Sequence, residues 1–131
     1  MRFSIRYALL VVSITVAVSV ALAAASTPAA RLKNPVQADA KSIAAGKATY
    51  DNACAKCHGE TGKGDGRMGD ELDPNPSNLV DGYWKHGSTD GDIYTAIHDG
   101  NKGTGMRAYG RKLTPHQIWD VVNYVRSIGP H

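Results

Sequence analysis

Two cysteines and a histidine stand close together near the middle of the chain. Cys54 and Cys57 are three positions apart, His58 follows directly, and the chain contains no other cysteine. This C-x-x-C-H spacing is the attachment pattern of a c-type haem. Each thiol can add across one vinyl group to form a thioether bond, and the histidine is then held beneath the iron as its proximal ligand. The motif therefore predicts one covalently bound haem c.

Three other uses of paired cysteines fit the sequence less well. A redox disulfide of the thioredoxin type needs a βαβ context, and no strand pattern lies near the motif. A zinc site needs four ligands, and neither a second cysteine pair nor an H-x3-5-H pair follows downstream. Idle thiols are unsuited to an exported protein, because free cysteines oxidise there. Haem attachment is the interpretation that these observations favour.

The first 25 residues have the pattern of a secretion signal. Arg2 and Arg6 supply positive charge, and the uncharged run from Tyr7 to Ala25 ends in small residues of the A-x-A kind. That run is nineteen residues long, which is close to a membrane span, so an uncleaved N-terminal anchor is the alternative. In either case the rest of the chain is expected outside the cytoplasm, in the periplasm or anchored to the outer face of the inner membrane.

The part that follows the signal is expected to hold a single domain. Residues 26–38 contain small residues and proline and are expected to form a flexible tether, which leaves residues 39–131 as the domain. Without residues 1–25 the chain keeps thirteen basic and twelve acidic residues, and this balance does not indicate nucleic-acid binding. A core built from about 90 ordered residues is modest. A large apolar haem would therefore form part of it.

A helix is expected to deliver the first cysteine. Asp39 or Ser42 can cap its start. Its inward face is then formed by positions at helical spacing, which are Ile43, Gly46, Tyr50 and Cys54. The glycine-rich and proline-rich stretch 59–76 leaves no room for a regular element and is expected to be a loop.

Two further helices are expected after this loop. One begins near Thr89 or Asp90, and Gly100 is placed to end it. A glycine-containing loop, residues 101–112, comes next. The last helix has Thr114 as its N-cap, a capping box completed by Gln117, and apolar residues at helical spacing up to Gly129-Pro130. No useful alternating strand pattern follows residue 35, so the fold class is all-α.

These features resemble the class I c-type cytochromes, from about Ile43 to Gly129. The shared features are a helix ending in C-x-x-C-H, a lone methionine in a late glycine-rich loop and a closing helix with an aromatic residue. The resemblance implies a cytochrome c fold, with three to five helices around one haem. It also implies that the first and last helices cross at four matching positions, Gly46, Tyr50, Val121 and Tyr124.

The resemblance further implies a methionine as the sixth iron ligand, and Met106 matches it. Met106 lies forty-eight residues beyond His58, with a helix between them that can carry the chain to the distal face. Met68 lies only ten residues beyond His58, in the loop that first leaves the proximal side. Alternatives are bis-histidine ligation through His86 or His98, or an open sixth site.

Three residues are expected to shape the haem environment. In the family, a proline carbonyl accepts the N–H of the proximal histidine, and Pro76 matches that position better than Pro74. Trp84 resembles an aromatic residue at the haem edge, where its indole N–H can donate to a propionate or the ring can simply pack. The family usually has proline after the methionine, but this chain has Arg107, which can pair with a propionate. The missing proline bears on the strength of the iron–sulfur bond.

Histidine–methionine ligation would leave no iron position open to dioxygen or peroxide, which points to one-electron transfer. The protein is thus expected to be an electron carrier and not an enzyme. The alternative is a haem enzyme or gas-binding domain with a labile sixth ligand.

The expected partners are redox proteins outside the cytoplasm, with a dehydrogenase or reductase as donor and a terminal oxidase or reductase as acceptor. The carrier is expected to be a monomer, in contact with membrane only if its N-terminal segment is uncleaved. Residues 101–112 hold four basic residues and no acidic one, whereas residues 59–73 hold five acidic residues against two basic ones. A positive rim at the methionine loop would steer an acidic partner.

Overall fold

The computed structural model describes residues 27–130, and this part of the chain is helical with no strand. A 3-10 helix is followed by four α-helices, whose bounds are η1 (Ala29–Arg31), α1 (Ala40–Ala53), α2 (Ala55–His58), α3 (Asp90–Asp99) and α4 (Pro115–Ile128). The predicted all-α class is confirmed. The predicted secretion signal lies outside the described residues. None of the helices in residues 27–130 has the length and apolar character needed to span a membrane.

Helices α1 and α4 cross closely because Gly46 has no side chain. A Cβ at Gly46 would collide with the backbone carbonyl of Asp120 and press on Tyr124. One turn further along α1, the rings of Tyr50 and Tyr124 meet with their centroids 5.0 Å apart. The crossing expected from the sequence is thus present, although Gly46 faces Asp120 and Tyr124 rather than Val121.

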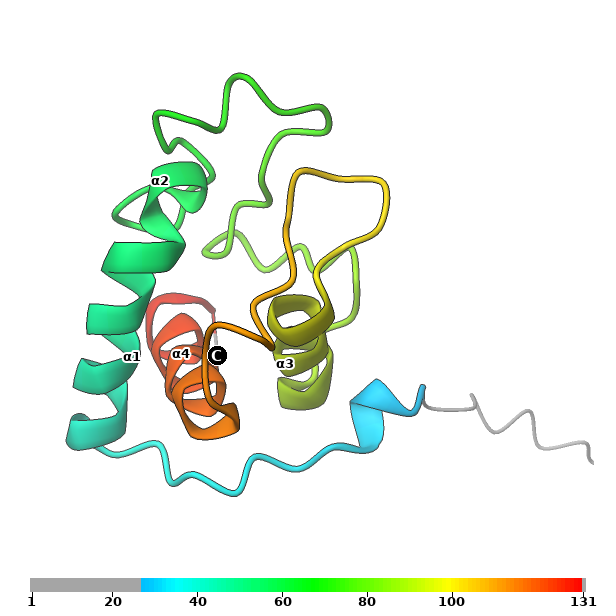
Figure 1. Ribbon diagram of the computed structural model, residues 1–131. Coiled ribbons are helices and arrows are strands. Elements are labelled where there is room, and N and C mark those ends of the chain that lie inside the picture. The colour runs from blue at the N-terminus through cyan, green and yellow to red at the C-terminus, as the bar shows by residue number, and fades with distance from the viewer. Residues whose placement is uncertain (1–26, 131) are drawn as a thin grey trace, which may run out of the picture.

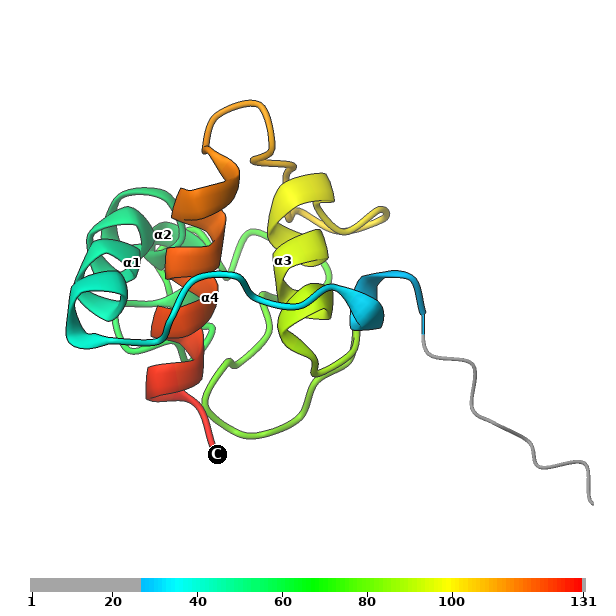
Figure 2. The same cartoon turned by 90° about the horizontal axis from the view of Figure 1, so that it is seen from below.

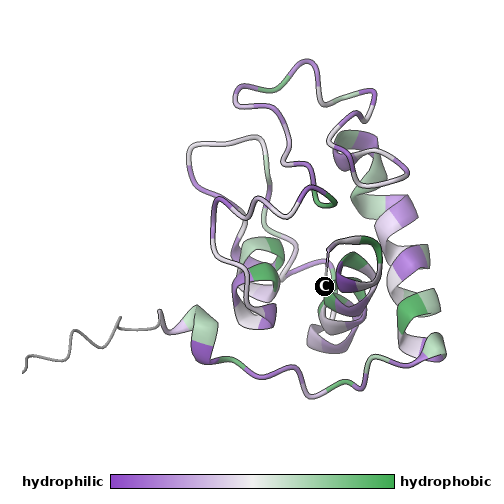
Figure 3. Ribbon diagram, turned by 180° about the vertical axis from the view of Figure 1, so that it is seen from behind, coloured by the Kyte–Doolittle hydropathy of each residue, from purple (hydrophilic) through white to green (hydrophobic). Residues whose placement is uncertain are grey.

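Helix α4 forms the centre of the core, and every residue from Ile118 to Val125 is buried. Helix α3 covers another side of it through Ile93 and Ile97, and Tyr94 stacks on Trp119 at a centroid distance of 4.2 Å. Figure 3 shows that hydrophobic segments gather where the helices face one another, whereas the loops are mostly hydrophilic or neutral. The helices therefore form one core beneath the loops.

Residues 27–38, which belong to the stretch 26–38 expected to be a flexible tether, lie as a strap across the helices. The strap runs over α4 from the start of α1 to η1, which lies beside α3 (Figure 2). The Asn34 side chain donates to Asn123 Oδ1 at 2.7 Å, and the Asn123 amide in turn lies 3.2 Å from the Val36 carbonyl. The folded domain thus begins before residue 39. The composition of residues 27–38 does not indicate the strap, because Asn34 and its hydrogen-bond partner Asn123 lie nearly ninety residues apart in sequence.

Two long loops connect the last three helices. Residues 59–89 join α2 to α3, and residues 100–114 join α3 to α4. Both loops lie on the same side of the helices (Figure 1). This arrangement brings the chain just after the C-x-x-C-H motif close to the loop that carries Met106.

Candidate functional site

The C-x-x-C-H motif lies on a tight turn at the junction of two helices. Cys54 ends α1, where its amide donates to the Tyr50 carbonyl at 2.8 Å, and it also begins the short helix α2. The amides of Cys57 and His58 both donate to the Cys54 carbonyl, at 3.1 and 3.0 Å. Two thiols and one imidazole are therefore held on a single turn. Burial raises the pKa of the Cys54 thiol to about 12, with a smaller contribution from the charge of Cys57.

The imidazole of His58 is oriented by the loop that follows it. Its Nδ1 lies 3.1 Å from the Ser77 carbonyl oxygen, so an N–H there leaves Nε2 with a free lone pair. The sequence had predicted the Pro76 carbonyl as this acceptor, and the structure corrects the assignment by one residue. An irregular loop has no fixed periodicity, so the carbonyl that faces a given side chain cannot be counted from the sequence. Burial lowers the pKa of His58 and outweighs the hydrogen bond to Ser77, which acts to raise it. The lowered pKa favours the neutral imidazole, which is the form that binds metals.

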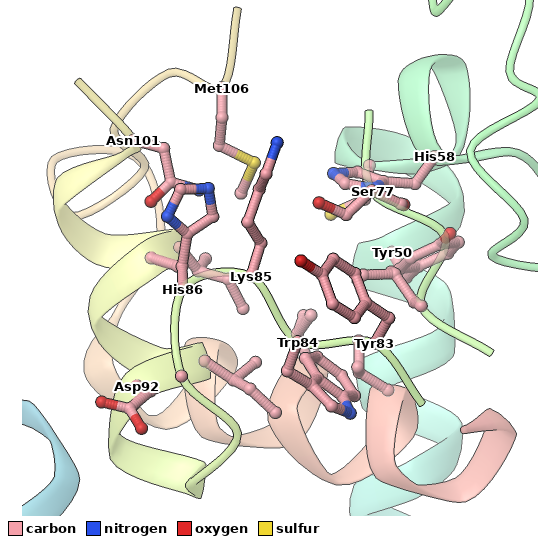
Figure 4. Close-up of a pocket in the computed structure, with 18 residues that line it drawn as sticks. Tyr50, His58, Ser77, Tyr83, Trp84, Lys85, His86, Asp92, Asn101 and Met106 are labelled. Carbon is pink, nitrogen blue, oxygen red and sulfur yellow. The ribbon is translucent and has the colours of Figure 1, made fainter. Parts of the chain in front are cut away.

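A cavity of about 730 Å³ opens between this turn and the Met106 loop. Its lining includes nearly all the residues expected at the site, namely Cys54, Cys57, His58, Pro76, Met106 and Arg107. Figure 4 shows an adjoining cavity, where His58 and Met106, which line both cavities, face each other from opposite sides. Trp84 lines this adjoining cavity, which shares Cys54, His58 and Met106 with the first. The volume lies within the range of small-molecule and cofactor sites.

The backbone of the loop around Met106 is held by its own hydrogen bonds. The Asn101 amide donates to the Met106 carbonyl at 3.1 Å, and the Met106 amide donates to Thr104 Oγ1 at the same distance. Gly100 has a positive φ of 72° and lies so close to this carbonyl that a side chain would not fit. These restraints fix Met106 at the cavity wall even though Arg107 replaces the usual proline.

Three residues considered in the sequence analysis lie outside the cavities, at an exposed edge, or in a contact that leaves their predicted role untested. His98 lines neither cavity, because its ring stacks on Tyr94 and its Nδ1 lies 2.6 Å from an Asp99 oxygen. Met68 is exposed at the edge of the larger cavity. Trp84 packs beneath Arg126, whose guanidinium carbon lies 5.7 Å from the ring centroid. The predicted contact of Trp84 with a propionate therefore stays a prediction.

Sequence reasoning missed Tyr109, which forms part of the cavity wall. Its hydroxyl donates to the Ala53 carbonyl at 2.9 Å, at the end of α1 beside the attachment turn. Burial raises the pKa of this phenol, which keeps the hydroxyl protonated as a donor. A contact over 56 residues leaves no local signal, although an aromatic residue close to Met106 was visible in the sequence.

The donor set in this cavity suits a covalently bound haem. Two thiols lie at one edge, an imidazole with a free lone pair lies on one wall, and a thioether lies on the opposite wall. Histidine and methionine are both established haem ligands.

Comparison with known proteins agrees with this geometry. Residues 43–129 match the family model described as Cytochrome c. The chain belongs to the cytochrome c family. A c-type haem bound covalently at the Cys54–Cys57 pair follows from this membership together with the motif.

Curated relatives of this cytochrome include subunits of cbb3-type cytochrome c oxidases. Subunit FixP of Azorhizobium caulinodans is 38% identical over 76 residues, which cover 58% of this chain and 24% of that protein. Subunit CcoP of Azospirillum brasilense is 33% identical over 96 residues, which cover 73% of this chain and 32% of that protein. The cytochrome thus spans between a quarter and a third of the length of these two relatives.

Solved structures show the same fold. The Kustc0457/Kustc0458 reducing HAO-like complex of Kuenenia stuttgartiensis matches with a TM-score of 0.68 and 29% identity, over 76% of this chain and 50% of that chain. Cytochrome cL of Methylophaga aminisulfidivorans matches with a TM-score of 0.57 and 26% identity, over 73% and 57% of the two chains. The predicted cytochrome c fold is confirmed.

Proposed function

We propose that this cytochrome is a one-electron carrier with a single haem c, linked to Cys54 and Cys57 and held between His58 and Met106. The observation that carries the proposal is the placement of His58 and Met106 on opposite sides of one cavity. A haem between them would have both axial positions filled. The bound haem supplies reversible one-electron oxidation and reduction.

The side chains around the cavity support this role. The bond from His58 Nδ1 to the Ser77 carbonyl fixes the ring and makes the imidazole more electron-rich. The soft thioether of Met106 favours the reduced state and raises the reduction potential. A filled sixth position excludes dioxygen and peroxide, so the protein is proposed to be a carrier and not an enzyme.

We further propose redox partners outside the cytoplasm, with a dehydrogenase or reductase as donor and a terminal oxidase or reductase as acceptor. The similarity to oxidase subunits supports an acceptor of that class. The proposed location is the periplasm, with the protein acting as a monomer.

Four basic side chains line the larger cavity and give its mouth a positive charge: Lys56, Lys85, Arg107 and Lys112. This charge supports docking of an acidic partner surface at the haem edge.

Absorption spectroscopy with haem quantitation on the purified protein tests the proposal. We expect one haem per chain and a sulfur-to-iron charge-transfer band in the ferric protein. Met106→Leu should abolish that band, whereas the matched control Met68→Leu should retain it, because Met68 is exposed at the cavity edge. Carbon monoxide binding by the reduced native protein at neutral pH would instead support a haem enzyme or gas-binding domain. A protein without covalent haem would refute the proposal altogether.

A further inference from the structure

The cavity wall around Met106 carries a second group that can bind iron. His86 lines both cavities together with Met106, Lys85 and Asn101. Figure 4 shows the His86 ring beside Met106 and Asn101, across the opening from His58. An imidazole and a thioether therefore share the side on which the sixth ligand must lie.

His86 is also chemically free to act as a ligand. Among the histidines of residues 27–130, His98 is hydrogen bonded to a neighbouring carboxylate at 2.6 Å, and His116 Nε2 lies 3.7 Å from an Asp120 oxygen. No hydrogen bond or ion pair within this part of the chain engages His86. Its ring would thus lose no existing partner on binding a metal.

The segment that carries His86 has few restraints. Within the described residues, no backbone hydrogen bond outside the helices uses an amide or carbonyl between Trp84 and Gly87. His86 is exposed, and Gly87 after it has a positive φ of 94°. A small shift of this loop can move the ring without breaking a helix.

Lys85 is the competing group on the same wall. An ammonium nitrogen has no lone pair to offer a metal until it loses a proton, whereas a neutral imidazole presents one without losing a proton. Histidine is also an established haem ligand. The imidazole is therefore the stronger candidate on this wall.

We propose that His86 is a reserve axial ligand, which binds the haem iron through an imidazole nitrogen whenever the Met106 thioether leaves the metal. This inference rests on the proposed function, in which Met106 is the sixth ligand of the native protein. The exchange is a ligand substitution: the iron–sulfur bond breaks, the ring lone pair forms an iron–nitrogen bond, and neither an electron nor a proton is transferred. With His86 bound, the iron would remain closed to small ligands.

Removal of Met106 from the full-length holoprotein tests the reserve role. At neutral pH, ferric Met106→Ala should remain low-spin, with a lower reduction potential than the native protein because imidazole replaces thioether. Met106→Ala/His86→Ala should become high-spin and bind added imidazole on the order of tenfold more tightly, since the internal competitor is gone. Met106→Ala/His98→Ala is the matched control, and it should behave like Met106→Ala. Met106→Ser repeats the comparison if the alanine variant does not accumulate.

Four outcomes separate this inference from the proposed function. The reserve role is overturned if ferric Met106→Ala is high-spin and if reduced Met106→Ala binds carbon monoxide as readily as the reduced double variant. A low-spin state that survives loss of His86 but disappears on Lys85→Ala assigns the role to lysine and also overturns it. A native protein without the sulfur-to-iron band refutes Met106 ligation itself. The single variant His86→Ala should keep that band, and its loss there would make His86 a native ligand.

Discussion

Gly46 lies where α1 packs directly against the backbone of α4. A methyl group there would collide with the Asp120 carbonyl, which is helix backbone and cannot swing away as a side chain can. Overpacking of this kind costs about 1–3 kcal/mol or more. We therefore expect Gly46→Ala to lower the free energy of unfolding by at least about 2 kcal/mol.

Chemical denaturation of the holoprotein measures this effect. Ala44→Ser is the control, because Ala44 is exposed on the same helix and its replacement should change stability by less than about 0.5 kcal/mol. Equal stability of Gly46→Ala and the native protein would show that the helices do not cross as closely as the structure has them.

Single residues also show how far sequence reasoning reaches. The attachment motif could be identified because its chemistry needs fixed residue types at fixed spacing, and the family match agrees with it. The acceptor for His58 was predicted to be the Pro76 carbonyl and is the Ser77 carbonyl, because an irregular loop has no periodicity to count. Tyr109 was missed because its hydrogen bond joins parts of the chain that are distant in sequence.

The start of helix α3 depends on a reciprocal pair of hydrogen bonds between Thr89 and Asp92. Each backbone amide donates to the other residue's side chain at 3.1 Å. Slight burial acts to raise the pKa of Asp92, but the hydrogen bonds from Thr89 outweigh it and hold the pKa below its usual value. The ionised carboxylate is thus the form that caps the helix.

A depressed carboxylate pKa contributes stability that is present above the unfolded pKa of about 4 and lost as pH falls through the folded value. Asp92→Asn should therefore be less stable than the native protein by about 0.3–1 kcal/mol at pH 7, because the carboxylate is largely exposed to solvent, and the difference should shrink below about pH 4. Denaturant unfolding across pH measures this. Asp70→Asn, at an exposed loop residue, is the control and should leave the pH profile unchanged. A difference between Asp92→Asn and native that is constant with pH would contradict the cap.

The helices could be predicted from the sequence because their signals are local. Asp39, Thr89 and Thr114 cap the three long helices. Thr114 was predicted, and Asp39 and Thr89 were each one of two candidates. The strap could not be predicted, because Asn34 and Asn123 lie far apart in sequence and polar residues at a chain terminus usually indicate disorder. Long-range polar contacts leave no periodic pattern.

The strap leads to a prediction about local stability. The Val36 amide donates to Asn34 Oδ1 at 2.9 Å, so it should exchange with solvent more slowly than an amide in a free tether. Asn34→Ala removes this acceptor and the bond to Asn123, and should speed Val36 exchange about tenfold or more. Gln37→Ala alters an exposed strap side chain and should leave the Val36 rate unchanged. Hydrogen exchange followed by NMR measures both, and random-coil exchange of Val36 in the native protein would contradict the strap.

At the scale of the whole molecule, charge is distributed unevenly although residues 26–131 are nearly neutral, with thirteen basic and twelve acidic residues. Four basic side chains line the cavity mouth. Residues 59–73, part of the loop predicted over residues 59–76, hold five acidic residues against two basic ones. Exposed charges act over about 8–10 Å at physiological salt, so the mouth should attract an anionic reactant more strongly than net charge suggests.

Electron transfer from the reduced protein to hexacyanoferrate(III), a small anionic oxidant, should therefore slow as salt is added. Arg107→Glu/Lys112→Glu reverses two charges at the mouth and should lower the low-salt rate by roughly tenfold. Lys33→Glu/Lys41→Glu makes the same change in net charge at exposed positions on the strap and the start of α1, outside both cavities, and should have a much smaller effect. Stopped-flow kinetics over a range of ionic strength measures all three proteins. Equal slowing by the two double variants would mean that net charge, and not the cavity mouth, governs the encounter. A rate independent of salt would remove electrostatic steering as the basis of partner docking.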